Sequence, residues 1–592
     1  MCGIAGEIRF DGRVADIRTV TAMTETMADR GPDSNGYFTQ GPRAFGHQRL
    51  RIMDLSERSH QPFIDTDLGL GVVFNGAIYN HPQLRIELKN KGYNFVSTGD
   101  TEVIIKAWHC WGEKALDRLQ GMFAFCLWER DTGRSILVRD RLGIKPLYYS
   151  QTGDHLHFAS SLKALLKVPG INTNLDPVAL HRYLSFHAVV PAPHTIYQGI
   201  KKLPPATMMI VERDGATREK TWWKLGFERS EEDLKRSDAE WQELTLEAMR
   251  TAVRRRLVAD VPVGVLLSGG VDSSLITGLL AEEGVPDLRT YSIGFEAVNG
   301  EAGDEFEYSR TIAQHFQTDH QEIFIPSRDI PTALPQAIAA MNEPMVSHDC
   351  VAFYLLSREV SKRTRVVQSG QGADEVFGGY HWYPPMLEAR HPVDDYHRVF
   401  ADRDHSEMTK LLTRDFLKED YSRAFIEQHF NQPGATDAVD KALRIDTTVM
   451  LVDDPVKRVD NMTMAFGLEA RVPFLDHEVV ELAARMPAMQ KINHGGKYVL
   501  KEAARKVIPA SVIDRPKGYF PVPALKYLKG AMLDIARERL LDSKAKTAGV
   551  FQRDYVEHLL DDPGKHITPL RGSKLWQLTL LEWWLDTHQA SA

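Results

Sequence analysis

A seven-residue segment with the sequence SGGVDSS, residues 268–274, constrains this chain more than any other stretch. It follows an apolar run at 261–267 that predicts a buried parallel strand, and it precedes a stretch with the apolar spacing of a helix. In such a strand–turn–helix unit, the turn N–H groups and the helix N-terminus favour a bound anion. Glycines allow the backbone to approach a phosphate, and serine hydroxyls can donate hydrogen bonds to it. The expected contact residues are Ser268, Gly269, Gly270 and Ser273.

The same turn carries a carboxylate, Asp272, which repels phosphate unless a cation lies between them. Mg²⁺ binds carboxylate and phosphate oxygens together, so we expect Asp272 to be a magnesium ligand. The Gly-Lys-Ser/Thr of the P-loop is missing. For a shorter part of this pattern, an ordinary turn would be the simpler interpretation. The full segment resembles the pyrophosphate-binding loop of ATP pyrophosphatases, which convert ATP to AMP and pyrophosphate. That resemblance implies adenylation.

A second strand-and-turn pattern, RVVQSGQGADEVFGGY, occupies residues 365–380. By itself it could be a surface turn. Together with the first turn it predicts the other half of a nucleotide site, with Ser369 and Gly370 near ATP. Asp374 would then share the magnesium ion with Asp272.

Strand-like and helix-like stretches alternate from about residue 263 to 325, which predicts a parallel α/β sheet. Ligands of such sheets bind at the carboxyl ends of the strands, where Leu266 and Ile293 are expected to lie. Residues 380–460 are expected to be mostly helical.

The composition predicts a soluble, cytoplasmic enzyme of two or three domains. A length of 592 residues exceeds one ordinary domain, and the net charge of −8 gives no reason to expect nucleic acid as a partner. We find no apolar run of the roughly 18 residues needed to cross a membrane, and no signal peptide. The four cysteines lack metal-site spacing and suit a reducing cytosol. They are Cys2, Cys110, Cys126 and Cys350.

Cys2 becomes the N-terminal residue if the initiator methionine is removed. It then carries both a thiol and an α-amine, whose ordinary pKa of about 7.7–8.0 makes it a plausible proton acceptor for the thiol. A cysteine near a terminus can equally be inert, but the motifs that follow favour a nucleophile. They are Arg49, Leu50 and Ile52 of an Arg-Leu-x-Ile motif, the pair Asn75 and Gly76, and Asp100.

With these motifs, residues 2–200 resemble a class II glutamine amidotransferase domain, of the kind with an N-terminal nucleophile. The resemblance implies that Cys2 attacks the glutamine amide and that Arg49 binds the glutamine carboxylate. Asn75 and Gly76 would form the oxyanion hole, and Asp100 would bind the ammonium.

The chain as a whole resembles glutamine-dependent asparagine synthetases. Lys497 aligns with the catalytic lysine that stabilises charge on the α-phosphate in that family. The implied fold is an α+β N-terminal-nucleophile glutaminase sandwich, then an α/β parallel-sheet ATP-pyrophosphatase domain with a helical C-terminal part. We expect the glutaminase domain at 2–215, a linker at 216–245 and the synthetase domain at 246–592.

Two residues depart from the asparagine synthetase pattern. Ala77 replaces a glutamate of the glutamine pocket, and Gln371 replaces the glutamate of Ser-Gly-Glu-Gly. At both positions the chain resembles the N-acetylglutaminylglutamine amide synthases. The expected enzyme is therefore a glutamine- and ATP·Mg²⁺-dependent ligase that adenylates a carboxylate, with N-acetylglutaminylglutamine as acceptor. Aspartate remains an alternative acceptor. Two further alternatives are a non-catalytic regulatory relative and a β-lactam-forming cyclase of the same fold. The sequence leaves open whether the chain forms homo-oligomers.

Overall fold

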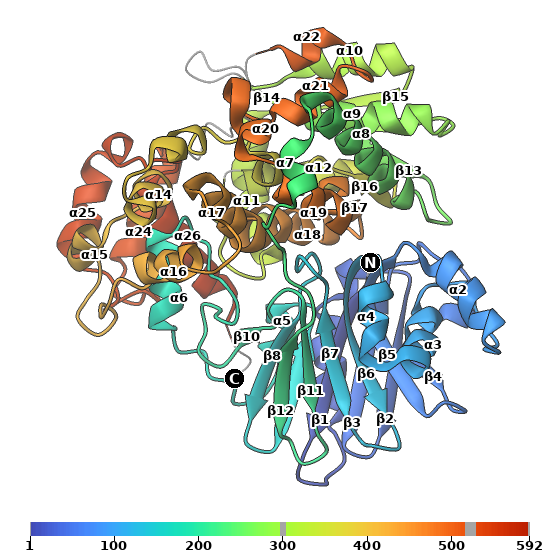
Figure 1. The fold of residues 1–592 in the computed structure, drawn as a ribbon. Helices are drawn as coiled ribbons and strands as arrows, with labels where there is room; N and C mark the ends of the chain where they lie inside the picture. Colours follow the sequence, from blue (N-terminus) through green and yellow to red (C-terminus); the bar gives the residue numbers. More distant parts are fainter. Residues whose placement is uncertain (1, 297–302, 348, 516–527, 590–592) are drawn as a thin grey trace.

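The computed structural model describes residues 2–296, 303–347, 349–515 and 528–589. Two six-stranded antiparallel sheets form the N-terminal part, and a five-stranded parallel sheet surrounded by helices forms the rest (Figure 1). The N-terminus lies at the end of the sandwich that faces the parallel-sheet part (Figure 1). This is the fold class expected from the sequence, and it places Cys2 between the two parts.

The first sheet has the strand order β10-β8-β9-β1-β3-β2 and the second has the order β12-β11-β7-β6-β5-β4. The first comprises β1 (Gly3–Arg9), β2 (Ser34–Gln40), β3 (Arg43–Arg49), β8 (Tyr148–Thr152), β9 (His155–Ala159) and β10 (Lys201–Lys202). The second comprises β4 (Phe63–Asp65), β5 (Leu70–Ile78), β6 (Gly121–Glu129), β7 (Ser135–Arg139), β11 (Thr207–Val211) and β12 (Thr217–Thr221).

Alternating apolar residues of both sheets face each other and form one buried core. Ile4 and Phe158 of the first sheet pack with Val73 and Leu137 of the second. The outer face of the second sheet is covered by α2 (His81–Asn90) and α3 (Thr101–Trp111), and that of the first by α1 (Ile17–Glu25) and α5 (Leu162–Leu165). Because helices cover the outside of the sheets, central strands such as β5 and β6 are buried on both faces.

The parallel sheet has the order β15-β14-β13-β16-β17. Its strands are β13 (Val263–Leu266), β14 (Arg289–Phe295), β15 (Asp319–Ile325), β16 (Val366–Gln368) and β17 (Glu469–Arg471). The chain leaves β13 toward β14 on one side and later returns to β16 on the other. The strand order therefore reverses beside β13, which is where open parallel sheets bind ligands.

Helices cover both faces of this sheet and build a helical region beside it (Figure 1). Those at the sheet are α8 (Asp238–Arg255), α9 (Val271–Glu282), α10 (Phe306–Phe316), α11 (Ile330–Ala340), α12 (Asp349–Val360), α13 (Ala373–Phe377), α18 (Lys457–Met464), α19 (His477–Arg485) and α21 (Tyr498–Ala504). The others include α6 (Pro177–Ser185), α14 (Pro392–Phe400), α15 (His405–Leu411), α16 (Tyr421–Phe430), α17 (Ala438–Ile445), α24 (Ala531–Leu541), α25 (Arg553–Asp561) and α26 (Lys574–Thr587). In the described part of the chain, every helix is too short or too polar to cross a bilayer.

The stretch that we expected to be a linker has regular structure. Strand β12 pairs with β11 and completes the second sheet, so the expected boundary at residue 215 falls inside a hairpin. Helix α7 (Glu231–Lys235) follows, and α8 begins at Asp238 with a capping box of Ser237 and Glu240. The polar sequence of β12 is explained by its exposure, because it is an edge strand.

Candidate active site

Cys2 lies directly before β1, where the two sheets of the sandwich meet. It is buried, and its backbone nitrogen donates a hydrogen bond of 3.0 Å to Oδ1 of Asn75 on β5. The contact joins the first sheet to the second and brings together two residues 73 positions apart. Burial raises the pKa of the Cys2 thiol, so the thiol needs a nearby proton acceptor before it can attack an amide.

Gly76 continues the strand after Asn75 and allows a close approach of β6. A Cβ atom at this position would lie 2.2 Å from the carbonyl oxygen of Met122 and 2.7 Å from Cα of Phe123. Only glycine therefore fits. The side-chain nitrogen Nδ2 of Asn75 lies 3.4 Å from the hydroxyl of Ser160. Both the oxygen and the nitrogen of this side-chain amide therefore have a hydrogen-bond partner.

Arg49 ends β3, and its guanidinium is held in place by backbone carbonyls. It donates to the carbonyl oxygens of Asp54 at 2.5 Å and Ser56 at 2.9 Å. A guanidinium has five N–H donors, so a pre-oriented Arg49 retains donors for a substrate carboxylate. Arg49 lines one small pocket together with Cys2, Leu50, Ile52, Gly76, Ala77 and Asp100.

Asp100 occupies the N-cap position of α3. Its side chain makes no capping hydrogen bond and instead accepts one of 2.9 Å from the backbone N–H of Ile78. Burial raises the pKa of Asp100 to about 6. A buried carboxylate at the end of β5 is thus available to a cationic group in the pocket.

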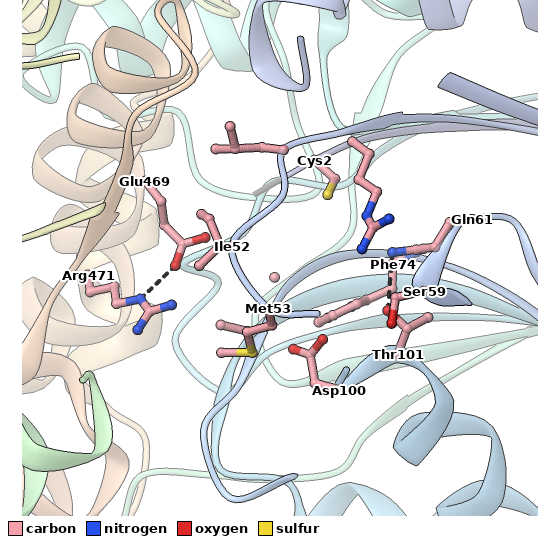
Figure 2. Close-up of a pocket in the computed structure, with 14 residues that line it drawn as sticks. Cys2, Ile52, Met53, Ser59, Gln61, Phe74, Asp100, Thr101, Glu469 and Arg471 are labelled. Atoms are coloured by element: carbon pink, nitrogen blue, oxygen red, sulfur yellow. Dashed lines mark hydrogen bonds and ion pairs between the residues drawn. The ribbon is translucent and has the colours of Figure 1, made fainter. Parts of the chain in front are cut away.

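Two residues of the parallel-sheet part also line this pocket, and the sequence did not indicate them. Glu469 and Arg471 lie on β17, the edge strand closest to the sandwich (Figure 2). Nε of Arg471 donates to Glu469 at 2.6 Å, and Nη1 donates to the carbonyl of Arg256 at 2.8 Å. The pocket around Cys2 is therefore built by both parts of the chain.

The second site begins where β13 ends. Leu266 is the last residue of that strand, and Gly270 is the N-terminal cap of α9. The backbone N–H of Ser268 donates to the hydroxyl of Ser273 at 3.1 Å, which closes the loop on itself. Gly269 has a φ of +78°, a conformation that side chains disfavour.

The loop after β16 packs directly against this first loop. A Cβ atom on Gly370 would lie 3.0 Å from Cβ of Asp272 and 3.2 Å from the nitrogen of Ser273. Because β13 and β16 are parallel neighbours, their carboxyl ends meet at one edge of the sheet. The two loops enclose a cavity of about 210 Å³. Its walls include Leu266, Ser268, Asp272, Ser273, Ile293, Ser369, Gly370, Gln371, Asp374 and Glu375.

Lys497 joins the two acidic residues of these loops. Its Nζ lies 2.7 Å from Oδ2 of Asp272 and 2.9 Å from Oδ1 of Asp374. Burial opposes the charge, but the two carboxylates raise the pKa of Lys497, which stays protonated. Gly379 makes room for this arrangement, because a Cβ there would lie 2.1 Å from Oδ1 of Asp374 and 2.3 Å from Cε of Lys497.

Glu375 is a third residue that the sequence did not single out. It is only 2% exposed and lines the same cavity. Burial and the neighbouring charge of Asp374 raise its pKa to about 7, and the hydroxyl of Tyr380 donates to it at 2.7 Å. A carboxyl with this pKa can accept or release a proton near neutral pH.

Buried ion pairs fix the sandwich against the parallel-sheet part. Arg30 and Lys145 of the sandwich contact Asp460 on α18 at 2.9 and 3.2 Å. Arg30 also donates to the carbonyl of Cys2 at 3.3 Å. Arg30 thus connects Cys2 to the second part.

The fold and the two sites define a glutamine-hydrolysing amidotransferase in which a nucleophile domain is joined to a synthetase domain. The asparagine synthase family model matches residues 244–586, and the model of a glutamine amidotransferase domain matches residues 1–223. The first match alone spans more than half of the chain. The chain belongs to the asparagine synthase family.

Several relatives match this chain over nearly its whole length. "Asparagine synthetase [glutamine-hydrolyzing] 1" of Bacillus subtilis is 31% identical, over 95% of this chain and 93% of that protein. "Asparagine synthetase [glutamine-hydrolyzing] 3" of the same organism is also 31% identical, over 88% of this chain and 87% of that protein. "Amidase chyE" of Penicillium rubens is 25% identical, over 88% of this chain and 89% of that protein. Proteins whose names indicate different activities thus match this chain over most of its length.

Proposed function

We propose that this chain converts a substrate carboxylate to a carboxamide, using glutamine as the nitrogen donor and ATP as the activating agent. Glutamine hydrolysis supplies ammonia, and ATP converts the carboxylate to an acyl-adenylate with release of pyrophosphate. Ammonia then displaces AMP. The observation that supports this most directly is that Asp272 and Asp374 line one cavity and that both contact Lys497, so that three separate stretches of sequence meet there.

For glutamine hydrolysis, Cys2 would attack the side-chain amide and its own α-amine would take the thiol proton. The guanidinium of Arg49 suits the substrate carboxylate and the carboxylate of Asp100 suits the substrate ammonium. The oxyanion would be stabilised by the Asn75 amide and the N–H of Gly76. Release of ammonia leaves a thioester on Cys2, which water cleaves to glutamate.

For adenylation, we propose that Mg²⁺ accompanies ATP and is held by Asp272 and Asp374. Two carboxylates close enough to share one ammonium offer the oxygen ligands that Mg²⁺ prefers. When bound, the ion would neutralise phosphate charge. Lys497 would stabilise negative charge on the α-phosphate, and Glu375 would accept the proton that the attacking ammonia loses.

We propose N-acetylglutaminylglutamine as the acceptor, and Gln371 is the residue that favours it. Gln371 lies in the wall of the cavity, beside the two acidic residues. An aspartate site must bind two carboxylates and one ammonium, whereas a blocked dipeptide has no ammonium. A glutamine in place of a glutamate removes a negative charge that a substrate without an ammonium does not need, and its amide can pair with another amide.

Aspartate is the second candidate acceptor, because the two Bacillus subtilis relatives carry the name asparagine synthetase. Pyrophosphate release with each acceptor distinguishes the two. We expect N-acetylglutaminylglutamine to support a rate at least about tenfold higher than aspartate, a difference of about 1.4 kcal/mol in transition-state stabilisation. We also expect Gln371→Glu to lower the dipeptide rate. Asparagine formation from aspartate with no turnover of the dipeptide would overturn the acceptor proposal.

A further inference from the structure

A cluster of three side chains lies in the helical region, apart from both active sites. His181 is on α6, His405 is the first residue of α15, and Asp420 is the residue that caps α16. Each offers one nitrogen or oxygen atom, and these atoms all lie within 4.8 Å of one another. Helix α6 packs against both α15 and α16, so the cluster joins segments that are more than 200 residues apart (Figure 1).

Hydrogen bonds around His181 determine which ring nitrogen carries its proton. The hydroxyl of Ser185 donates to the carbonyl of His181 at 2.7 Å, which uses its only hydrogen. The hydroxyl of Ser422 lies 2.6 Å from that of Ser185 and must supply the hydrogen between them. Nδ1 of His181 lies 3.2 and 3.3 Å from the two hydroxyls. Because neither hydroxyl has a hydrogen left, Nδ1 must be the donor.

Nε2 of His181 then presents a lone pair toward the cluster. His181 is completely buried, and among the described residues Nε2 has no hydrogen-bond partner. Burial lowers the pKa of His181 to about 4, so the ring is neutral at physiological pH. A buried acceptor without a partner destabilises the folded chain unless a ligand or a water molecule satisfies it. Metal-binding histidines commonly have this arrangement, with one nitrogen held by a neighbour and the other directed at the metal.

The other members of the cluster have matching features. Nδ1 of His405 is also buried and without a partner among the residues described. The rings of His181 and His405 lie 5.9 Å apart. Asp420 accepts a capping hydrogen bond of 3.1 Å from the N–H of Arg423, and a carboxylate has further acceptor sites.

We propose that His181, His405 and Asp420 form a binding site for a divalent transition-metal ion of the Zn²⁺ type. Two imidazoles and one carboxylate are ligands that such ions prefer over Mg²⁺ or Ca²⁺. Ligand atoms about 2.0–2.2 Å from the metal lie roughly 3–3.5 Å apart, so small side-chain rotations would complete the site. The ion cross-links α6 to α15 and α16 and has a structural role, separate from amide formation.

The test uses full-length protein freed of metal with a chelator, with Zn²⁺ and Co²⁺ as probes. It is carried out in the Cys2→Ala variant as well, so that a thiol does not contribute to binding. We expect one Zn²⁺ per chain, a higher Tm after Zn²⁺ addition, and a Co²⁺ absorption spectrum without thiolate bands. His405→Gln and Asp420→Asn are expected to weaken Zn²⁺ binding by roughly 10-fold or more. Asparagine keeps the helix cap of α16 intact, so Asp420→Asn should remain folded.

His429→Gln is the matched control. His429 is on α16, burial lowers its pKa to about 4, and its Nδ1 is likewise buried without a partner in the described chain. It lies outside the cluster. Zn²⁺ binding that is unchanged in His429→Gln but weakened in the two cluster variants supports the proposal. A folded wild-type protein that takes up no Zn²⁺, or equal uptake in all variants, overturns it.

Discussion

The ammonium of Lys497 lies 2.7 Å from a carboxylate oxygen of Asp272, although the two residues are 225 positions apart in the sequence. The same nitrogen lies 2.9 Å from Asp374. One lysine thus holds together the loops that follow β13 and β16. Both the geometry of the cavity and its charge depend on this contact.

Lys497→Met is therefore expected to stop acceptor-dependent pyrophosphate release. The change removes a cation near the phosphates and leaves two acidic side chains without it, so we expect a loss of roughly 10²–10³-fold. Glutamine hydrolysis, measured as glutamate formed, should change little. An equal loss of both activities would show instead that Lys497 supports the whole fold.

Cys2→Ala should abolish glutamine-dependent product while ammonia-dependent product remains. Cys2 lies in the sandwich, whereas the residues proposed to bind ATP lie at the parallel sheet, so removal of the thiol should leave the second site intact. We expect a decrease of roughly 10⁴-fold or more in glutaminase activity. The measurement compares product formed with glutamine and with ammonium salt. Loss of both activities would contradict the two-site mechanism.

Asp272→Asn and Asp374→Asn each keep the side-chain shape and remove the charge proposed to bind magnesium. We expect each to lower ATP-dependent pyrophosphate release by roughly 10²–10³-fold, with glutamine hydrolysis still measurable. The exposed hairpin residue Asp214 provides a control, and Asp214→Asn should have no effect. Full ATP-dependent activity in either variant would exclude that carboxylate as an essential ligand.

The KM for glutamine should depend on pH through Asp100. Burial raises the pKa of this carboxyl to about 6 in the free enzyme, and only its ionised form can bind the substrate ammonium. As the pH falls below about 6, Asp100 becomes protonated, and KM should rise about tenfold for each further pH unit. Above pH 7 it should be constant. Asp100→Asn should have a high KM at every pH, and an unchanged profile in this variant would assign the titration to another group.

Gly379→Ala tests the close contact around Lys497. The added methyl group would lie 2.1 Å from Asp374 and 2.3 Å from Lys497, so one of them must move. A displacement of about 1 Å in a catalytic group can cost about 10²-fold in rate, and we expect a loss of that size in pyrophosphate release. Gly564→Ala is the control, because its Cβ would approach only Asp562, at 3.7 Å. Wild-type activity in Gly379→Ala would argue against a tightly packed site.

Much of the architecture is determined by short-range patterns in the sequence. The apolar run before residue 268 and the helical spacing after it predict a strand, a turn and a helix, and these are β13, its loop and α9. The period of the apolar residues decides whether they can cover a sheet or a helix face, and glycine decides where the backbone can turn. These effects act over a few residues and can be read directly.

Only the tertiary structure decided which distant residues meet. Glu469 and Arg471 reach the pocket of Cys2 because β17 is the edge strand that faces the sandwich. Glu375 has a raised pKa because its surroundings exclude water, which no local pattern encodes. His181 lies beside His405 because α6 packs on helices that follow more than 200 residues later. Burial, electrostatic interaction and ligand distance depend on positions in space, and the chain order alone does not contain them.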